Sequence, residues 1–107
     1  MLVMKFGGSS VRSSARIRHV LDLVVKARKR DRNLVVVFSA YQGVTDQLIA
    51  TSKLAAAGDK KYLIGLRSLR KRHMDTLAEL VPLRQRRSSA EFVRDRLADL
   101  TDVLHGV

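Results

Sequence analysis

The chain has 107 residues, which is enough for one small domain. Its 21 Lys and Arg outnumber ten Asp and Glu, giving a formal net charge of +11 that favours anionic partners such as nucleic acid, nucleotide phosphates or acidic metabolites. The absence of cysteine excludes disulfides, thiolate catalysis and cysteine-based zinc sites.

No apolar run approaches the roughly 20 residues of a membrane helix. The first apolar run meets Lys5 too soon to form the core of a secretory signal. We therefore expect a cytoplasmic protein with no membrane partner.

The first part of the chain has the pattern of a βαβ unit. Residues 2–6 and 34–38 are short apolar runs, and the second is β-branched throughout its centre, as is typical of a parallel strand covered on both faces. Between them, from about Ser14 to Arg30, apolar residues recur at helical spacing. They are Ile17, Val20, Leu21, Val24 and Val25. A strand, a helix and a strand over about forty residues form a right-handed βαβ unit.

After Thr45 the pattern is helical. Thr45 is predicted to be the N-cap, with Val44 and Ile49 at the positions of a hydrophobic staple. Gly58 is predicted to end this helix.

Two further helices are predicted. The first follows a cap at Asp59 and ends before Pro82. Residues 83–87 are predicted to be a polar, basic connection, and residues 88–91 to form the capping box of the last helix, which Gly106 ends. Phe92 is among the residues expected on the apolar stripe of that helix, with Val93, Leu97, Leu100 and Leu104.

Two predicted strands are fewer than a stable sheet normally needs. The second strand requires neighbours that do not follow along this chain. We expect residues 1–107 to be the front piece of a longer protein, in preference to a domain completed by another chain.

A lysine and a glycine turn follow the first strand. Lys5 is the only charge in that strand, and Gly7, Gly8 and Ser9 come next, before a helix. A strand-end lysine often only reaches water, and paired glycines often only make a tight turn. The same arrangement presents backbone N–H groups and a cation to phosphate oxygens. The spacing is neither that of a P-loop nor that of a Rossmann fingerprint.

A second polar loop follows the second strand. Turns after parallel strands share one edge of a sheet, where ligands of open α/β proteins usually bind. Ser39 and Thr45 lie in this loop, and a helix that begins at Thr45 would favour a carboxylate. Both hydroxyls are also explained by local backbone bonding.

The remaining polar residues predict no further site. His19, His73 and His105 lack the spacing of metal ligands, so no metal site is predicted. The basic runs 70–72 and 84–87 are interpreted as solvated helix faces, because no nucleic-acid motif accompanies them.

These two loops resemble a known family. Residues 5–11, Lys-Phe-Gly-Gly-Ser-Ser-Val, resemble the amino-terminal signature of aspartate kinases, and residues 39–46 are similar to the Ser-Ala-x-x-Gly-Val-Thr-Asp segment of that family. Arg12 and the pair Tyr41-Gln42 depart from the commoner residues of the family.

The resemblance implies an α/β fold, the amino-terminal part of the three-layer αβα amino-acid-kinase fold. It implies transfer of the γ-phosphoryl group of ATP, bound with Mg²⁺, to the side-chain carboxylate of L-aspartate. By the same resemblance, the residues that contact the ATP phosphates are Lys5, Gly7, Gly8 and Ser9, with Lys5 catalytic. Those that contact L-aspartate are Ser39 and Thr45.

The resemblance also implies parts that these residues lack: an acidic substrate segment, the adenine and ribose site, and regulatory ACT domains. We expect residues 1–107 to be a partial catalytic domain, inactive alone, whose partner is the remainder of the kinase chain; a homo-oligomer stays open. Two alternatives also stay open. One is a small basic nucleic-acid-binding module, and the other is a related kinase for glutamate or N-acetylglutamate, against which the match of residues 39–46 argues.

Overall fold

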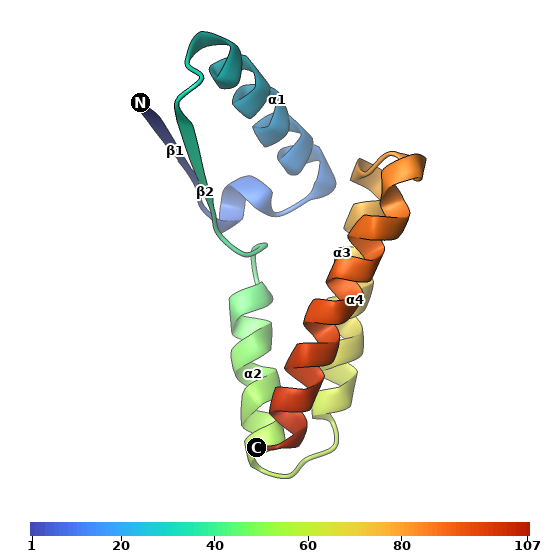
Figure 1. Cartoon of the computed structure of the whole chain (residues 1–107). Helices are drawn as coiled ribbons and strands as arrows, with labels where there is room; N and C mark the ends of the chain where they lie inside the picture. Colours follow the sequence, from blue (N-terminus) through green and yellow to red (C-terminus); the bar gives the residue numbers. More distant parts are fainter. The chain divides into compact units, whose positions relative to one another are not determined.

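The computed structural model describes all residues from 1 to 107, and they form two compact units, Met1–Thr45 and Asp46–Val107. The elements are given below in chain order, and Figure 1 labels the strands and the α-helices. They are β1 (Leu2–Phe6), the 3-10 turn η1 (Gly8–Val11), α1 (Ser14–Arg30), β2 (Leu34–Phe38), α2 (Val44–Ala56), α3 (Tyr62–Leu80) and α4 (Leu83–His105). The predicted bounds of both strands and of the first helix are confirmed.

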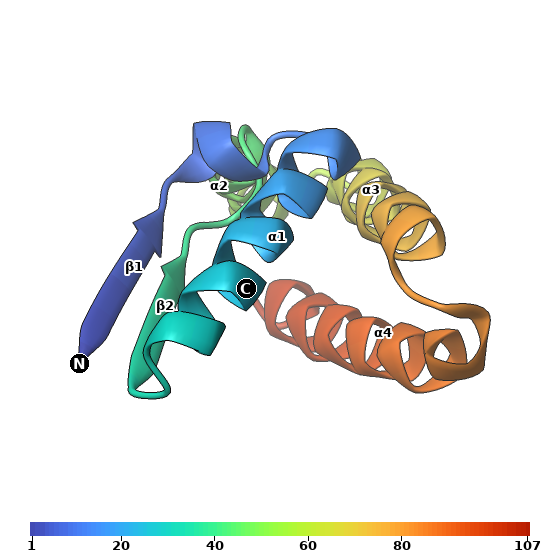
Figure 2. The ribbon, with the colours of Figure 1, turned by 90° about the horizontal axis from the view of Figure 1, so that it is seen from above.

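The first unit contains a two-stranded parallel sheet. Leu2 pairs with Leu34 at one end of the ladder and Phe6 with Phe38 at the other. Figure 2 shows both arrows running in the same direction. The ladder continues one step beyond the strands, because the Ser39 N–H donates to the Phe6 carbonyl over 3.0 Å. The predicted βαβ unit is therefore present, and it sets the carboxyl ends of the two strands side by side.

Helix α1 begins and ends where local chemistry favours it. The Ser13 hydroxyl accepts the Arg16 N–H over 3.2 Å, which satisfies one of the free donors of the first turn. Three cations, Arg28, Lys29 and Arg30, occupy the last turn, where the helix dipole favours positive charge. These local signals explain why the bounds of this helix could be predicted correctly.

Only one face of the sheet is covered by a helix of the first unit. Phe6 borders a cavity together with Val20 of α1, so the face that carries Phe6, Met4 and Val36 is turned to this helix. On the other face Val3, Val35 and Val37 are 57%, 44% and 45% exposed. The prediction that β2 is covered on both faces is wrong for this structure. The fold is α/β as expected, with one helical layer on this sheet.

The buried stripe of α1 is narrower than predicted. Val20 and Ala27 are buried, whereas Leu21 and Val25, both expected on the stripe, are exposed. The physical reason is the width of the sheet, because two strands cover only a narrow strip of a helix surface.

Helix α2 begins one residue before the predicted N-cap. Gly43 has a φ of 86°, which turns the chain, and the Val44 N–H donates to the Tyr41 carbonyl over 3.0 Å. Thr45 is therefore the second helical residue and not the cap. The predicted staple is also wrong, because Val44 is buried and Ile49 is half exposed.

The predicted glycine stop of α2 is confirmed. Gly58 has a φ of 70°, and the Asp59 N–H donates to the Leu54 carbonyl while the Gly58 N–H donates to the Ala55 carbonyl. This pair of bonds is a Schellman motif, which glycine favours because it has no Cβ. The Asp59 carboxylate then accepts the Lys61 N–H over 2.9 Å, so Asp59 supports the turn before α3. The predicted cap at Asp59 is wrong, because α3 begins at Tyr62 and Lys61 is at the N-cap position.

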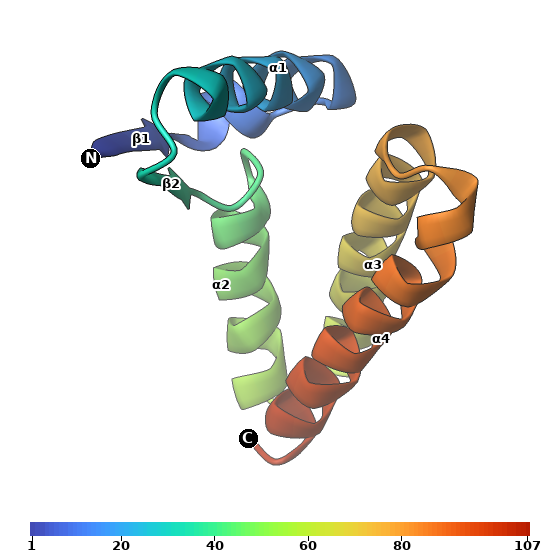
Figure 3. The same ribbon diagram turned by 45° about the horizontal axis from the view of Figure 1, so that its top comes forward.

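Helices α3 and α4 form an antiparallel hairpin around Pro82 (Figures 1 and 3). The predicted connection 83–87 and capping box 88–91 are both wrong, because α4 begins at Leu83 and Ser88 lies inside it, donating to the Gln85 carbonyl. Residues 83–91 contain neither glycine nor proline that would interrupt a helix, and Pro82, which has no backbone N–H, directly precedes the first helical residue. Gly106 ends α4, but in a right-handed conformation with a φ of −83°.

The core of the second unit is built by all three of its helices. Ala55 of α2, Leu66 of α3 and Leu104 of α4 form its buried cluster, and Tyr62 and Leu100 pack against it. Phe92, predicted on the apolar stripe of α4, is 63% exposed and lies outside this core.

Candidate functional site

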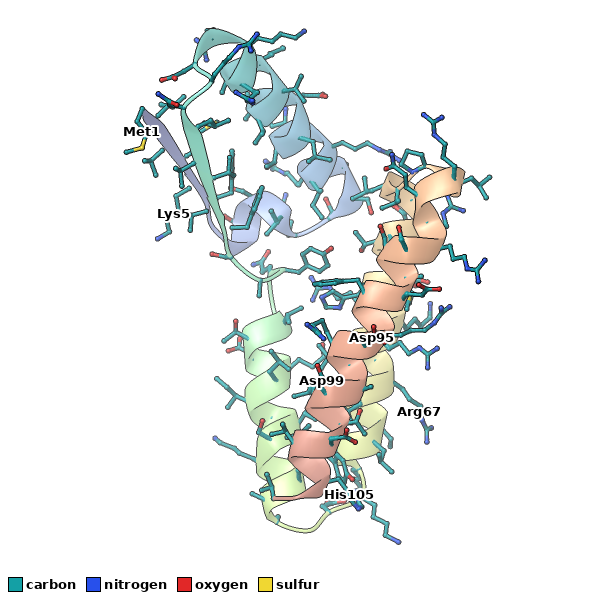
Figure 4. The ribbon with its side chains drawn as sticks, viewed as in Figure 1. Met1, Lys5, Arg67, Asp95, Asp99 and His105 are labelled. Carbon is teal, nitrogen blue, oxygen red and sulfur yellow. The ribbon has the colours of Figure 1, made fainter.

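The candidate site lies where β1 and β2 end, and Lys5 is its first residue. Lys5 pairs with Val37, on the sheet face opposite to α1, and its side chain is exposed. In Figure 4 the Lys5 side chain projects away from the helix. None of the ion pairs within the chain uses Lys5. Its ammonium group is thus a cation without an acidic partner at the end of a strand.

The glycine turn follows directly. Gly7 has extended backbone angles, with φ −77° and ψ 174°, and η1 begins at Gly8. The Ser10 N–H donates to the Gly7 carbonyl, which closes the turn over 3.0 Å. No heavy atom would lie within 4 Å of a Cβ on Gly7. The turn therefore leaves open space beside its backbone, where the first N–H groups of a 3-10 turn lack partners inside the turn.

The two polar loops are in contact. A Cβ on Gly8 would lie 3.5 Å from the Ala40 carbonyl oxygen and 3.6 Å from the Gln42 Cα. The predicted juxtaposition of the loops after the two strands is confirmed. It follows from the parallel register, which aligns Phe6 with Phe38.

The structure places Ser39 on the second loop, as predicted, and Thr45 inside the helix that follows this loop. Ser39 comes directly after β2, and Thr45 lies in the first turn of α2, followed by Asp46. Both side chains are exposed, and neither hydroxyl takes part in a hydrogen bond within the chain. Ser39 and Thr45 are therefore free to bind a ligand at the edge that also carries the glycine turn.

A cavity next to the glycine turn brings together residues that the sequence analysis did not connect. It has a volume of about 240 Å³, and Ser10, Arg16 and His19 line it together with Phe6, Val20 and Leu23. Arg16 and His19 lie three residues apart on α1, a spacing that places them on one helix face. This spacing of Arg16 and His19, close in sequence to Ser10, is the signal from which the sequence could have predicted that they lie together.

Two further properties bear on the class of protein. No group of three His, Asp or Glu side chains is arranged to hold a metal ion. None of the helices combines the length and the hydropathy that a membrane-crossing segment requires.

The family is shown by comparison with known proteins. Residues 1–101 match the model of the amino acid kinase family, and the chain belongs to this family. Among curated relatives it is similar to the aspartate kinase of Pseudomonas fluorescens, with 48% identity over 63 residues, or 59% of this chain and 15% of the relative. It is similar to the aspartokinase of Corynebacterium glutamicum, with 44% identity over 57 residues, or 53% of this chain and 13% of the relative.

A plant relative matches over a longer stretch. The bifunctional aspartokinase/homoserine dehydrogenase 2 of Arabidopsis thaliana is 30% identical over 105 residues, 98% of this chain and 11% of the relative. The chain thus spans between 11% and 15% of the length of these three relatives. The nucleic-acid-binding alternative has no support from these comparisons.

Proposed function

We propose that residues 1–107 are the amino-terminal segment of an aspartate kinase catalytic domain. The complete enzyme transfers the γ-phosphoryl group of ATP to the side-chain carboxylate of L-aspartate and forms 4-phospho-L-aspartate, the first step toward lysine, threonine and methionine. The observation that supports this best is the contact between Gly8 and residues 40–42, which unites the two family-like loops at one sheet edge.

In this proposal the first loop binds the ATP phosphates. Lys5 neutralises charge that develops on the transferring group, because a cation fixed beside phosphate oxygens stabilises the transition state. Gly7, Gly8 and Ser9 offer backbone N–H groups with open space beside Gly7. Mg²⁺ would be supplied as the complex with ATP and would neutralise part of the phosphate charge, and no residue of this segment is proposed as its ligand.

The second loop binds L-aspartate. The hydroxyls of Ser39 and Thr45 are exposed and have no partner within the chain, and Thr45 lies in the first turn of α2, where the helix dipole favours an anion. The acceptor carboxylate would thus lie next to the phosphate held by the first loop.

The segment needs the remainder of the kinase to act. A two-stranded sheet with Val3, Val35 and Val37 exposed on one face is less than the stable minimum for a sheet. We therefore propose a partial catalytic domain, cytoplasmic like the biosynthetic reaction it serves, whose oligomeric state depends on the complete chain.

The test is a chimera that joins residues 1–101 of this chain to the remainder of the Pseudomonas fluorescens relative. An assay of acyl phosphate formation from ATP and L-aspartate should show activity for the chimera and none for residues 1–107 alone. Lys5→Met should lower kcat by about a hundredfold or more. The matched control Lys26→Met, which removes an exposed lysine of α1, should leave kcat unchanged. A chimera that folds, binds ATP and phosphorylates glutamate in preference to aspartate would contradict the proposed substrate.

A further inference from the structure

A cavity in the second unit lies outside the proposed kinase site. It has a volume of about 340 Å³ and is bounded only by residues of α3 and α4. Leu63, Leu66 and Leu97 give it an apolar floor, and Leu66 is buried at 8% exposure. This volume is within the range of pockets that bind small molecules.

Three arginines border this cavity. They are Arg67 and Arg70 of α3 and Arg94 of α4. No acidic side chain lines the cavity, and none of the ion pairs within the chain uses these arginines. Figure 4 shows Arg67 extending from α3, and it labels Asp95 and Asp99 on α4, neither of which borders the cavity. Asp99 is paired with Arg96 over 3.0 Å.

The three exposed arginines concentrate positive charge around the cavity without an acidic partner beside it. Arg67 and Arg70 are three residues apart on one helix, a spacing at which like charges repel. An anion that accepts hydrogen bonds from two or more of these guanidinium groups would relieve the repulsion, and Arg forms such bonds readily with phosphate and carboxylate groups. A second copy of this chain is a poor occupant, because each copy carries a net charge of +11.

We infer that this cavity, which we call the arginine groove, binds a small amphipathic anion: a phosphate or carboxylate head group held by Arg67, Arg70 and Arg94, with an apolar tail on Leu63, Leu66 and Leu97. The groove lies entirely within α3 and α4, so the inference does not depend on phosphotransfer at the loops of the first unit. The apolar floor selects against inorganic phosphate, and the arginines select against neutral amphiphiles.

The test is a titration of the 107-residue chain followed by NMR, with octyl phosphate as the probe at concentrations below micelle formation. We expect saturable shifts in residues 63–70 and 94–101, with much weaker binding of inorganic phosphate and of 1-octanol. Shifts confined to residues 7–10 would place the ligand at the glycine turn and overturn the inference. Binding to anionic phosphatidylglycerol vesicles without any binding of monomeric octyl phosphate would also overturn it.

Two kinds of variant distinguish binding in the arginine groove from a general attraction of anions to this basic chain. Arg70→Gln should weaken binding by about tenfold, the loss expected for a charged hydrogen bond. Arg84→Gln removes the same charge from an exposed position of α4 outside the groove and should change affinity less than about twofold. Ala98→Met, which extends a lining side chain into the groove, should weaken binding at unchanged net charge. If Arg70→Gln and Arg84→Gln lowered the affinity equally, or if Ala98→Met bound octyl phosphate as well as the unaltered chain, the arginine groove would not be the binding site.

Discussion

Gly65 of α3 and Thr51 of α2 are in such close contact that a Cβ at position 65 would force the Thr51 side chain to shift. A Cβ on Gly65 would lie 3.2 Å from Thr51 Cγ2 and 3.3 Å from Thr51 Cβ, and closer still to Oγ1. Thr51 is only 3% exposed, so it has little room to move. This contact lies where α2 and α3 approach each other within the second unit. The Gln47 side-chain amide also joins the two helices, because its Nε2 donates to the Gly65 carbonyl oxygen over 3.5 Å.

We expect Gly65→Ala to destabilise the chain by about 1–2 kcal/mol, because overpacking outweighs the better helix propensity of alanine. Thr51→Ala removes Oγ1 and Cγ2, so the double variant should recover part of this loss. Urea unfolding of the four proteins in the cycle measures the coupling. The control Ser68→Ala alters an exposed position of α3 and should be nearly neutral. Strict additivity of the two substitutions would show that the contact is not the cause.

The glycines of the first loop should be dispensable for folding. A Cβ on Gly7 would meet open space, a Cβ on Gly8 would make only ordinary van der Waals contacts, and neither glycine has a positive φ. Gly7→Ala and Gly8→Ala should therefore change the free energy of unfolding by less than about 1 kcal/mol. In the kinase chimera the same substitutions should raise the KM for ATP, because a methyl group occupies the space proposed for phosphate oxygens.

Gly58 serves as the comparison for Gly7 and Gly8, because its backbone conformation does favour glycine. Its φ of 70° is a left-handed conformation, which costs a residue with a Cβ about 1–2 kcal/mol. Gly58→Ala should lower stability by about that amount in the same unfolding experiment. If Gly7→Ala proved as destabilising as Gly58→Ala, the glycine turn would have a structural role that its backbone angles do not explain.

Arg86 joins the beginning of α4 to the end of α3. Its guanidinium group donates to the Ala78 carbonyl over 3.0 Å and to the Val81 carbonyl over 3.1 Å, and these carbonyls would otherwise lack partners at a helix end. Arg86→Gln should cost about 1 kcal/mol of stability, since the site is partly solvated. Arg84→Gln, with no such bonds, should cost less than about 0.5 kcal/mol. Thermal unfolding of both variants checks the difference.

Lys71 and Asp75 form an exposed pair one helical turn apart on α3, with an N–O distance of 2.6 Å. The hydrogen bond to Asp75, and then its negative charge, raise the pKa of Lys71 above the ordinary value of 10.5. Because the folded pKa is the higher one, the stabilisation is complete below the unfolded pKa and is lost as the pH rises through the folded pKa. The pair should therefore weaken only in alkaline solution above about pH 10.5.

An NMR titration of the Lys71 side chain measures this directly. Asp75→Asn should lower the pKa of Lys71. An identical Lys71 titration in both proteins would mean that the pair does not persist in solution.

The elements of the first unit were predictable because each has a strong local signal. β2 is a continuous apolar run, and α1 has a serine cap and a basic last turn. The beginning of α4 was not predictable in this way. The serine and glutamate of residues 88–91 imitate a capping box, but the helix already begins at Leu83, directly after Pro82.

Burial was harder to predict than secondary structure. Leu21, Val25 and Phe92 have the spacing of buried residues, yet they are exposed. Periodicity shows which residues share a helix face, and it does not show how wide a surface covers that face.

The sequence by itself determined the strands, most of the helices and the two loops whose residues match the amino acid kinase family. Local propensity, caps and motif spacing are encoded within a few neighbouring residues, which is why they can be read directly. Tertiary structure alone decided that Gly8 contacts residues 40–42, that Thr51 closes on Gly65, and that Arg67, Arg70 and Arg94 share one groove. These contacts join residues from different elements, and their positions depend on strand register and helix packing along the whole chain.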